Sequence, residues 1–151
     1  MSSSLFLDSS ILVEKLKGKR VDLYDWLIAD PSLTLCINQI VLSEFAFYLV
    51  AEEGGKSPLT LKRDQRIPAI LRENDPTELL ERFTYLDTDH SVISLYFFYM
   101  QQYNLLPNDA LILATCKLHR ITRIASYDAD FATACAGEGI QLIQQVTDLT
   151  V

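Results

Sequence analysis

The chain has 151 residues, of which 49% are hydrophobic and 22% charged, with only five glycines and five prolines. A chain of this length buries about 68–70% of the surface that it exposes when unfolded, and the composition excludes a disordered, collagen-like or low-complexity protein. Thirteen basic and twenty acidic residues give a formal net charge of −7, so a polyanionic partner has to bind a local patch.

The cysteines and the first residues of the chain indicate where in the cell the protein is expected. Cys36, Cys116 and Cys135 form no CxxC pair, and with two histidines they lack the spacing of a zinc site. The start, MSSSLFLD, lacks the basic region and the apolar stretch of a secretory signal. The longest uncharged apolar run, 92–100, is far shorter than the roughly 20 residues that span a bilayer. We expect a cytoplasmic protein that makes no membrane contact.

Apolar runs alternate with helical patterns along the chain. In order they predict a strand at 5–7, a helix at 9–16, a strand at 33–37, a helix at 41–51, a short helix at 76–83, a strand at 83–86, helices at 89–103 and 108–118, a strand at 123–125, a helix at 128–136 and a strand at 140–143. The predicted helix caps are Ser9 or Ser10, Asp75 or Thr77, Thr88 or Asp89, and Asn108 or Asp109. This alternation favours an α/β fold with a mostly parallel sheet, covered by helices on both faces.

The segment 52–75 interrupts this pattern. It contains Gly54-Gly55, Pro58 and the charged run 62–66, so we expect an exposed helical or loop excursion. Its basic residues are suited to phosphate contacts, although a solvated charged face is the commoner meaning of such a run.

Four acidic residues follow or lie near the ends of predicted strands. They are Asp8, Glu44, Asp109 and Asp128. Ligands of parallel α/β sheets bind beyond the carboxyl ends of the strands, so these carboxylates are placed to converge. A group of carboxylates is a strong site for a hard divalent cation, and oxygen ligands favour magnesium or manganese. Taken singly, Asp109 and Asp128 are better explained as acids at a helix start and Glu44 as a solvent-facing helix residue, so only the combination favours a site.

Four segments together resemble the PIN-domain family of nucleases: LFLDSSILVE, LSEF, LLPNDALILATCKLHRITRIASYDADF and the closing GIQLI. Members of this family have an acid and a small polar pair after the first strand and an acid in the helix after the second. They continue with a Pro-x-Asp-Ala-like helix start and a Ser/Thr-x-Asp after the fourth strand. The order of the elements, over most of the chain, makes the resemblance more specific than any single motif.

The resemblance implies that residues 1–151 form a single PIN-like domain, a three-layer α/β/α sandwich with a five-stranded sheet. It also implies an endoribonuclease that depends on Mg²⁺ or Mn²⁺. By the same resemblance the catalytic and metal-binding acids are Asp8, Glu44, Asp109 and Asp128, with Ser10, Ser126 and Asp130 as supporting positions. Many small members are toxins of VapBC-type toxin–antitoxin pairs, so the implied partners are RNA, single-stranded or in a structured loop, and a cognate antitoxin.

Two other functions remain open from the sequence. One is a catalytically silent PIN-like module that binds RNA or a protein and retains the acids as caps. The other is an α/β protein that transfers phosphate to Asp8, although no lysine with a fixed role is evident and no nucleotide-binding motif is present. A metal-free ribonuclease is disfavoured because His90 and His119 lie in helical patterns without an evident partner.

Two further groups of residues have structural explanations. The dense aromatic stretch Tyr96–Tyr99 has no interleaved basic residue, so we expect core packing or a homodimer contact, and not base stacking. The basic residues Lys15, Lys17, Lys19 and Arg20 lie near Asp8 in the sequence. They are equally typical of an exposed helix end, and the sequence does not assign them to a site.

Overall fold

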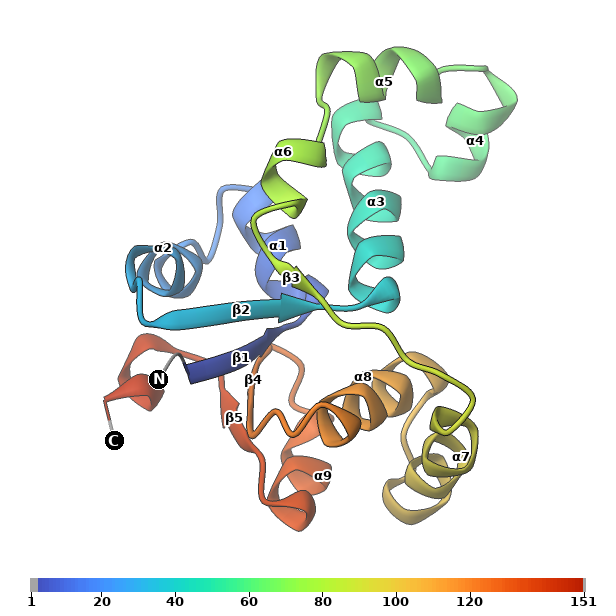
Figure 1. The fold of residues 1–151 in the computed structure, drawn as a ribbon. Coiled ribbons are helices and arrows are strands. Elements are labelled where there is room, and N and C mark those ends of the chain that lie inside the picture. The colour runs from blue at the N-terminus through green and yellow to red at the C-terminus, as the bar shows by residue number, and fades with distance from the viewer. Residues whose placement is uncertain (1–2, 151) are drawn as a thin grey trace.

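The computed structural model describes residues 3–150, which form a five-stranded sheet between two layers of helices (Figure 1). The strands are β1 (Ser3–Leu7), β2 (Leu33–Ile37), β3 (Thr84–Tyr85), β4 (Arg123–Ala125) and β5 (Gln141–Ile143). They lie in the order β3-β2-β1-β4-β5, and each neighbouring pair is parallel. The predicted α/β fold is confirmed, and the sheet, expected to be mostly parallel, is parallel throughout these five strands.

β1 is the central strand, as its composition requires. Leu5, Phe6 and Leu7 are completely buried, as expected where helices cover both faces of a sheet. Phe6 is paired with Cys36 of β2 on one side and with Ile124 of β4 on the other. The strand order reverses between β1 and β4, so the crevice beyond their carboxyl ends is the expected place for a ligand.

Helices cover both faces of the sheet. They are α1 (Ser9–Leu16), α2 (Asp22–Ala29), α3 (Gln39–Gly54), α4 (Pro58–Arg63), α5 (Ile67–Glu73), α6 (Thr77–Leu80), α7 (Val92–Tyr103), α8 (Pro107–Leu118), α9 (Phe131–Glu138) and the 3-10 helix η1 (Val146–Leu149). In Figure 1, α1, α2, α3 and α6 lie above the sheet, whereas α7, α8 and α9 lie below it. This arrangement confirms the three-layer α/β/α sandwich.

The start of α1 differs from the prediction. Asp8 is the N-cap residue, whereas Ser9, a predicted cap, is already helical, and Ser10 lies inside the first turn. The side chain of Asp8 makes no capping hydrogen bond to its own helix. Capping therefore does not account for this carboxylate.

The starts of α8 and α9 also differ from the prediction. α8 begins at Pro107, so Asn108 and Asp109 lie inside its first turn and do not cap it. Proline is favoured at this position because its ring fixes a helical φ and its missing N–H would have no partner there. α9 begins at Phe131, so Asp128 lies before the helix and not within it. Both acids thus stand where the chain enters a helix, with their side chains free to face the sheet edge.

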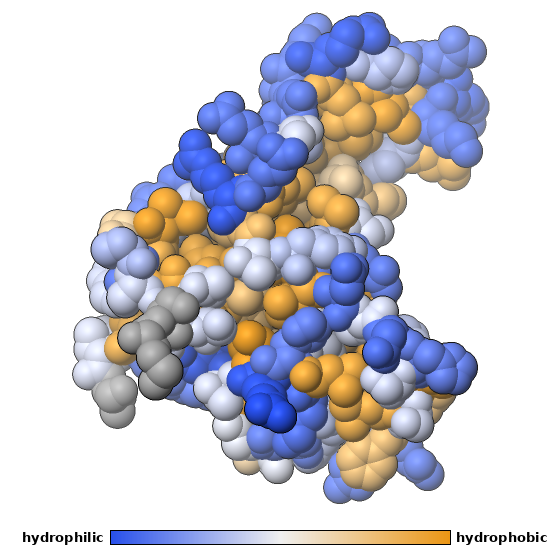
Figure 2. All heavy atoms as spheres, viewed as in Figure 1, coloured by the Kyte–Doolittle hydropathy of each residue, from blue (hydrophilic) through white to orange (hydrophobic). Residues whose placement is uncertain are grey.

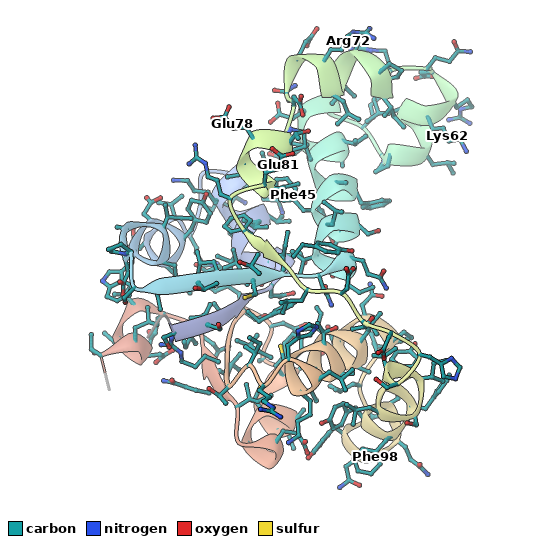
Figure 3. The ribbon with its side chains drawn as sticks, viewed as in Figure 1. Phe45, Lys62, Arg72, Glu78, Glu81 and Phe98 are labelled. Carbon is teal, nitrogen blue, oxygen red and sulfur yellow. The ribbon has the colours of Figure 1, made fainter. Side chains whose placement is uncertain are left out.

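Residues 52–75 contain the end of α3 together with α4 and α5. These two short helices lie beside the end of α3 that is farther from the sheet (Figure 1). A small apolar cluster of Val50, Leu61 and Ile70 holds them there, and it is separate from the main core. Figure 3 shows Lys62 and Arg72 at the outer edge of this part of the molecule.

Two other features of the described residues concern the cysteine thiols and the length of the helices. Cys36, Cys116 and Cys135 are free thiols, and all three are buried. None of the helices in residues 3–150 is long and apolar enough to cross a bilayer.

We expect Leu61→Ala to unfold α4 and α5 locally without unfolding the sheet. Leu61 is 1% exposed, and its truncation should remove about 2–5 kcal/mol from the only cluster that the structure shows for these two helices within residues 3–150. Native-state hydrogen exchange should show lost protection in residues 58–73 and retained protection in β1 and α8. Leu59→Ala, at a side chain that is 75% exposed on the same helix, is the control and should change neither. An equal loss of protection in the sheet would contradict this expectation.

Candidate active site

The candidate site lies at the carboxyl ends of β1 and β4, where the strand order reverses. Asp8 is the first residue after β1, and it is only 5% exposed. Its backbone N–H donates to the carbonyl of Ala125, the last residue of β4, at 3.0 Å. The pairing of the two strands thus extends to Asp8 and fixes the backbone from which its carboxylate projects.

Two hydroxyl groups hold one oxygen of the Asp8 carboxylate. Ser10 Oγ donates to Asp8 Oδ2 at 2.8 Å, and Ser126 Oγ donates to the same oxygen at 2.7 Å. Within residues 3–150, the structure shows no hydrogen bond to Asp8 Oδ1. The two serines therefore orient the carboxylate and leave its second oxygen for a ligand.

The same two serines bind the chain that follows β4. The backbone N–H of Tyr127 donates to Ser10 Oγ, and that of Asp128 donates to Ser126 Oγ, both at 3.0 Å. Ser10 comes from α1, so these bonds tie the β4 loop to the first helix. They place Asp128 on the same side of the sheet edge as Asp8.

Glu44 approaches the site from α3 and is half-buried. Burial raises the pKa of its carboxyl group, and the negative charge of Asp8 raises it further. The side chains of Ser9 and Asn108 act in the opposite direction, because they offer hydrogen bonds to the charged form. Glu44 is therefore close enough to Asp8 for the two charges to repel each other.

Asp109 is the acid with the most perturbed ionisation. Burial, followed by the charges of Asp128, Asp8, Glu44 and Asp130, raises the pKa of Asp109 to about 7. The side chain lies in the first turn of α8, which reaches the site from below the sheet in Figure 1. A carboxyl group that holds its proton near neutral pH shows how much negative charge the fold concentrates here.

Asp128 and Asp130 complete the cluster after β4. One side-chain oxygen from each of Asp109, Asp128 and Asp130 lies within 4.8 Å of the others. The backbone N–H of Asp130 donates to Asp128 Oδ1 at 2.9 Å, which shapes the turn before α9. Asp130 is exposed, in contrast to the other two, so it stands at the mouth of the site.

One cavity of about 260 Å³ brings the four predicted acids together. It is lined by Asp8, Ser9, Ser10, Val13, Glu14, Lys17, Glu44, Tyr48, Asp109 and Asp128. The predicted supporting residue Ser10 lies on its wall, whereas Ser126 is completely buried behind Asp8. Asp130 joins the site through its two neighbouring aspartates and not through this cavity.

The donor set fits a divalent cation. The ligands that the cluster offers are carboxylate oxygens, which are the ligands of magnesium and manganese. Burial raises the pKa values of Glu44 and Asp109, and the facing carboxylates raise them further; a cation between these groups would remove the repulsion. This acidic cluster is therefore a place where such a cation fits.

The sequence analysis missed a buried polar pair that joins two of the acid-bearing helices. Asn38 Oδ1 accepts hydrogen bonds from Ile40 and Val41 at the start of α3, and Asn38 Nδ2 donates to Thr115 Oγ1 of α8 at 3.0 Å. Asn38 follows directly after the predicted strand at 33–37, and this position was a signal of a helix cap. No sequence signal marks its bond to Thr115, which lies 77 residues away.

Asp109→Asn is expected to stabilise the protein without metal at alkaline pH. In the unfolded chain Asp109 loses its proton near its ordinary pKa, whereas in the folded protein the pKa is about 7. Between these values the folded state holds more protons, so the free energy of unfolding of the wild type falls as pH rises. The variant does not lose this free energy of unfolding. We put the difference between variant and wild type on the order of 1 kcal/mol after allowance for solvent screening.

Thermal unfolding in EDTA at several pH values measures this difference. The melting temperature of the variant should exceed that of the wild type at about pH 8, and the gap should close near pH 4. Glu78→Gln, at a side chain that is 92% exposed on α6, is the matched control and should show no such pH dependence. A gap that does not depend on pH would show that lost packing, and not the charge of Asp109, dominates.

Comparison with known sequences agrees with this geometry. The family model of the PIN domain matches residues 5–137. Ribonuclease VapC6 of Methanocaldococcus jannaschii is 36% identical over 140 residues, which cover 85% of this chain and 91% of that protein. Ribonuclease VapC2 of the same organism is 34% identical over 131 residues, which cover 85% of this chain and 87% of that protein.

Solved structures share the fold. A toxin–antitoxin complex from Klebsiella pneumoniae contains a chain that is 25% identical, with a TM-score of 0.59 over 86% of this chain and 91% of that one. VapBC2 from Rickettsia felis, bound to a DNA fragment of its promoter, has a TM-score of 0.60 over 92% of this chain and 96% of that one. Its identity is 18%, so it supports the fold alone. From the match over residues 5–137 and the identity to both M. jannaschii proteins, the chain belongs to the PIN-domain family and, within it, to the VapC ribonucleases.

Proposed function

We propose that this protein is a metal-dependent endoribonuclease that hydrolyses phosphodiester bonds of RNA, and that it is the toxin of a VapBC-type pair. The observation that carries this proposal is the cavity in which Asp8, Glu44, Asp109 and Asp128 converge at the reversal of strand order. The relatives that share the family are named as ribonucleases. The geometry and the kinship thus favour the same activity.

Asp8, Glu44, Asp109 and Asp128 are the residues that we propose to hold Mg²⁺ or Mn²⁺, with Asp130 at the mouth of the site. When bound, such a cation stabilises charge on the phosphodiester and lowers the pKa of water. The pKa of Asp109 is raised to about 7, so this group releases a proton when the cation binds near neutral pH.

Ser10 and Ser126 act through Asp8. Both donate to Oδ2 of its carboxylate, so they fix the direction in which Oδ1 points. Groups that orient a metal ligand in this way affect metal affinity or activity by about 10–100-fold when they are removed. We assign both serines as positioning residues, because neither needs to touch the substrate to have this effect.

Calorimetric titration of Mn²⁺ tests the metal site directly. The wild type should show saturable binding, which Asp8→Asn and Asp109→Asn abolish. Ser126→Ala should weaken it by about 10–100-fold. Glu78→Gln on the remote helix α6, labelled in Figure 3, should bind as the wild type does.

Cleavage of a labelled RNA in Mn²⁺ then tests the reaction, with single-stranded and hairpin substrates compared. The variants that lose Mn²⁺ binding should lose cleavage. Metal binding without cleavage of either substrate would favour the second candidate, a catalytically silent PIN-like module that binds RNA or a protein. Absence of Mn²⁺ binding in the folded wild type would exclude the proposed mechanism.

We also propose an antitoxin as the partner, because a structural relative at 25% identity is a toxin–antitoxin complex. A largely apolar groove of about 610 Å³ suits such a partner. It is lined by Ile37, Leu42, Ala46, Leu71, Asp75, Pro76, Thr77, Leu80, Glu81, Phe83 and Tyr85. In this proposal residues 1–151 act as a single domain, and the segment 52–75 contributes Leu71 and Asp75 to the wall of the groove.

The cytoplasm is the compartment that we propose. Three cysteines that are free and buried are typical of a reducing environment. RNA is available as a substrate there.

We propose that the protein is a homodimer that associates through α7. Ile93 is 47% exposed, and Phe97, one helical turn later, is 60% exposed. Figures 2 and 3 show apolar atoms at the surface of α7, at lower right, with Phe98 directed outward. Apolar side chains that gather on one exposed helix are typical of a contact between protein chains.

Phe97→Glu is expected to convert the dimer into a monomer, because the substitution would bury a charge in the contact. Sedimentation velocity at several protein concentrations measures the change. Leu59→Glu, at an exposed side chain on α4, introduces the same charge elsewhere and should leave the dimer intact. A wild type that sediments as a monomer at all concentrations would contradict the proposed dimer.

A further inference from the structure

The cavity that contains the four acids has a second wall of different chemistry. Beyond the carboxylates it is lined by Lys17, from the end of α1, and by Tyr48, from α3. The acids alone would repel the phosphates that flank a cleavage site. A cation and an aromatic ring are the two kinds of group that bind nucleic acid without reading its sequence, and both line this cavity.

Lys17 is the basic residue of this stretch that lines the cavity, and it forms no ion pair within residues 3–150. Its neighbours are engaged: Lys15 Nζ lies 2.6 Å from Asp25 Oδ1, and Arg20 Nε lies 3.5 Å from Glu14 Oε2. The structure shows no acidic partner for Lys17 in the range 3–150. A favourable interaction with the helix dipole explains a lysine at this position, but it does not explain why the lysine lies on the cavity wall beside a tyrosine.

Tyr48 lies one helical turn after Glu44, so both side chains project from the same face of α3. Its side chain is 45% exposed, although it lines the cavity. The ring makes an edge contact with Phe47, with 5.8 Å between the centroids, and Lys17 Nζ lies 5.9 Å from its centroid. Lys17 thus makes a cation–π contact with an accessible tyrosine ring, and together the two side chains offer a surface on which a base can stack while its phosphate is bound.

We propose that Lys17 and Tyr48 bind the nucleotide next to the scissile phosphate of a single-stranded RNA. Lys17 Nζ pairs with the phosphate of that nucleotide, and its base stacks on the ring of Tyr48. The inference rests on the proposed ribonuclease function, and it narrows the substrate to RNA with unpaired bases, because bases inside a duplex are stacked on each other and do not reach the ring.

Fluorescence anisotropy with a labelled single-stranded RNA of mixed sequence tests this inference. Binding is measured in Ca²⁺, which takes oxygen ligands, and a gel confirms that the RNA stays intact. The variants are Lys17→Ala, Lys17→Arg, Tyr48→Ala and Tyr48→Phe, and thermal unfolding checks that each is folded. Lys62→Ala, on α4 at the outer edge of the molecule in Figure 3, is the control for loss of one positive charge.

The two residues should give different signatures. Lys17→Ala should lower the slope of log affinity against log salt by about 0.7, the value for one phosphate contact on a single strand. Tyr48→Ala should weaken binding about tenfold with an unchanged slope, because stacking is not ionic. Lys17→Arg and Tyr48→Phe should bind as the wild type does. A duplex RNA of the same sequence should bind without dependence on Tyr48.

Three outcomes would overturn the inference: an unchanged salt slope in Lys17→Ala, an equal change in Lys62→Ala, or an unchanged affinity in Tyr48→Ala. Mn²⁺ titration separates this failure from failure of the proposed function, because both wall variants should bind Mn²⁺ normally whereas Asp109→Asn should not. If the wild type shows both signatures but cleaves no RNA, the wall residues bind RNA as inferred and the nuclease proposal is wrong.

Discussion

The mutual repulsion of carboxylates at one edge of the sheet is the constraint on which the rest of the structure depends. Asp8 is almost fully buried after the central strand, and Glu44 and Asp109 both have raised pKa values, first because they are partly buried and then because they face other acids. Such a site is unfavourable for the fold when no cation is bound. The surrounding structure therefore has to hold several segments together against this repulsion.

Interactions between distant segments meet this requirement. Ser10 and Ser126 join α1 to the loop after β4, and Asn38 joins the start of α3 to α8. On the lower face, Glu138 of α9 accepts hydrogen bonds from Tyr99 and Tyr103 of α7 at 2.7 and 2.6 Å. Each helix that carries or supports an acid is thus tied to a second element, around the buried end of β1 at Leu5–Leu7.

The strands and the site acids could be predicted from the sequence, because they depend on local composition and on position relative to the strand ends. The apolar runs gave β1, β2 and β4, and the rule that ligands bind beyond strand ends selected four acids that line one cavity. Helix starts were less predictable, because serine and asparagine are good caps in isolation, whereas a proline or a site carboxylate took the actual positions. The sequence analysis also missed the helix α2, although its buried residues Leu23, Tyr24 and Leu27 have helical spacing. The pairs Asn38–Thr115 and Lys17–Tyr48 depend on the tertiary arrangement, so local patterns could not predict them.

The net charge of −7 is compatible with a polyanionic substrate because the charges are not spread evenly. Five of the twenty acids belong to the candidate site, namely Asp8, Glu44, Asp109, Asp128 and Asp130. A proton on Asp109 and the proposed divalent cation would neutralise part of that charge, and Lys17 lines the same cavity and forms no ion pair within residues 3–150. The repulsion that makes the empty site unfavourable is therefore the same interaction that would favour the proposed cation. In the inferred binding mode, a phosphate lies between that cation and Lys17.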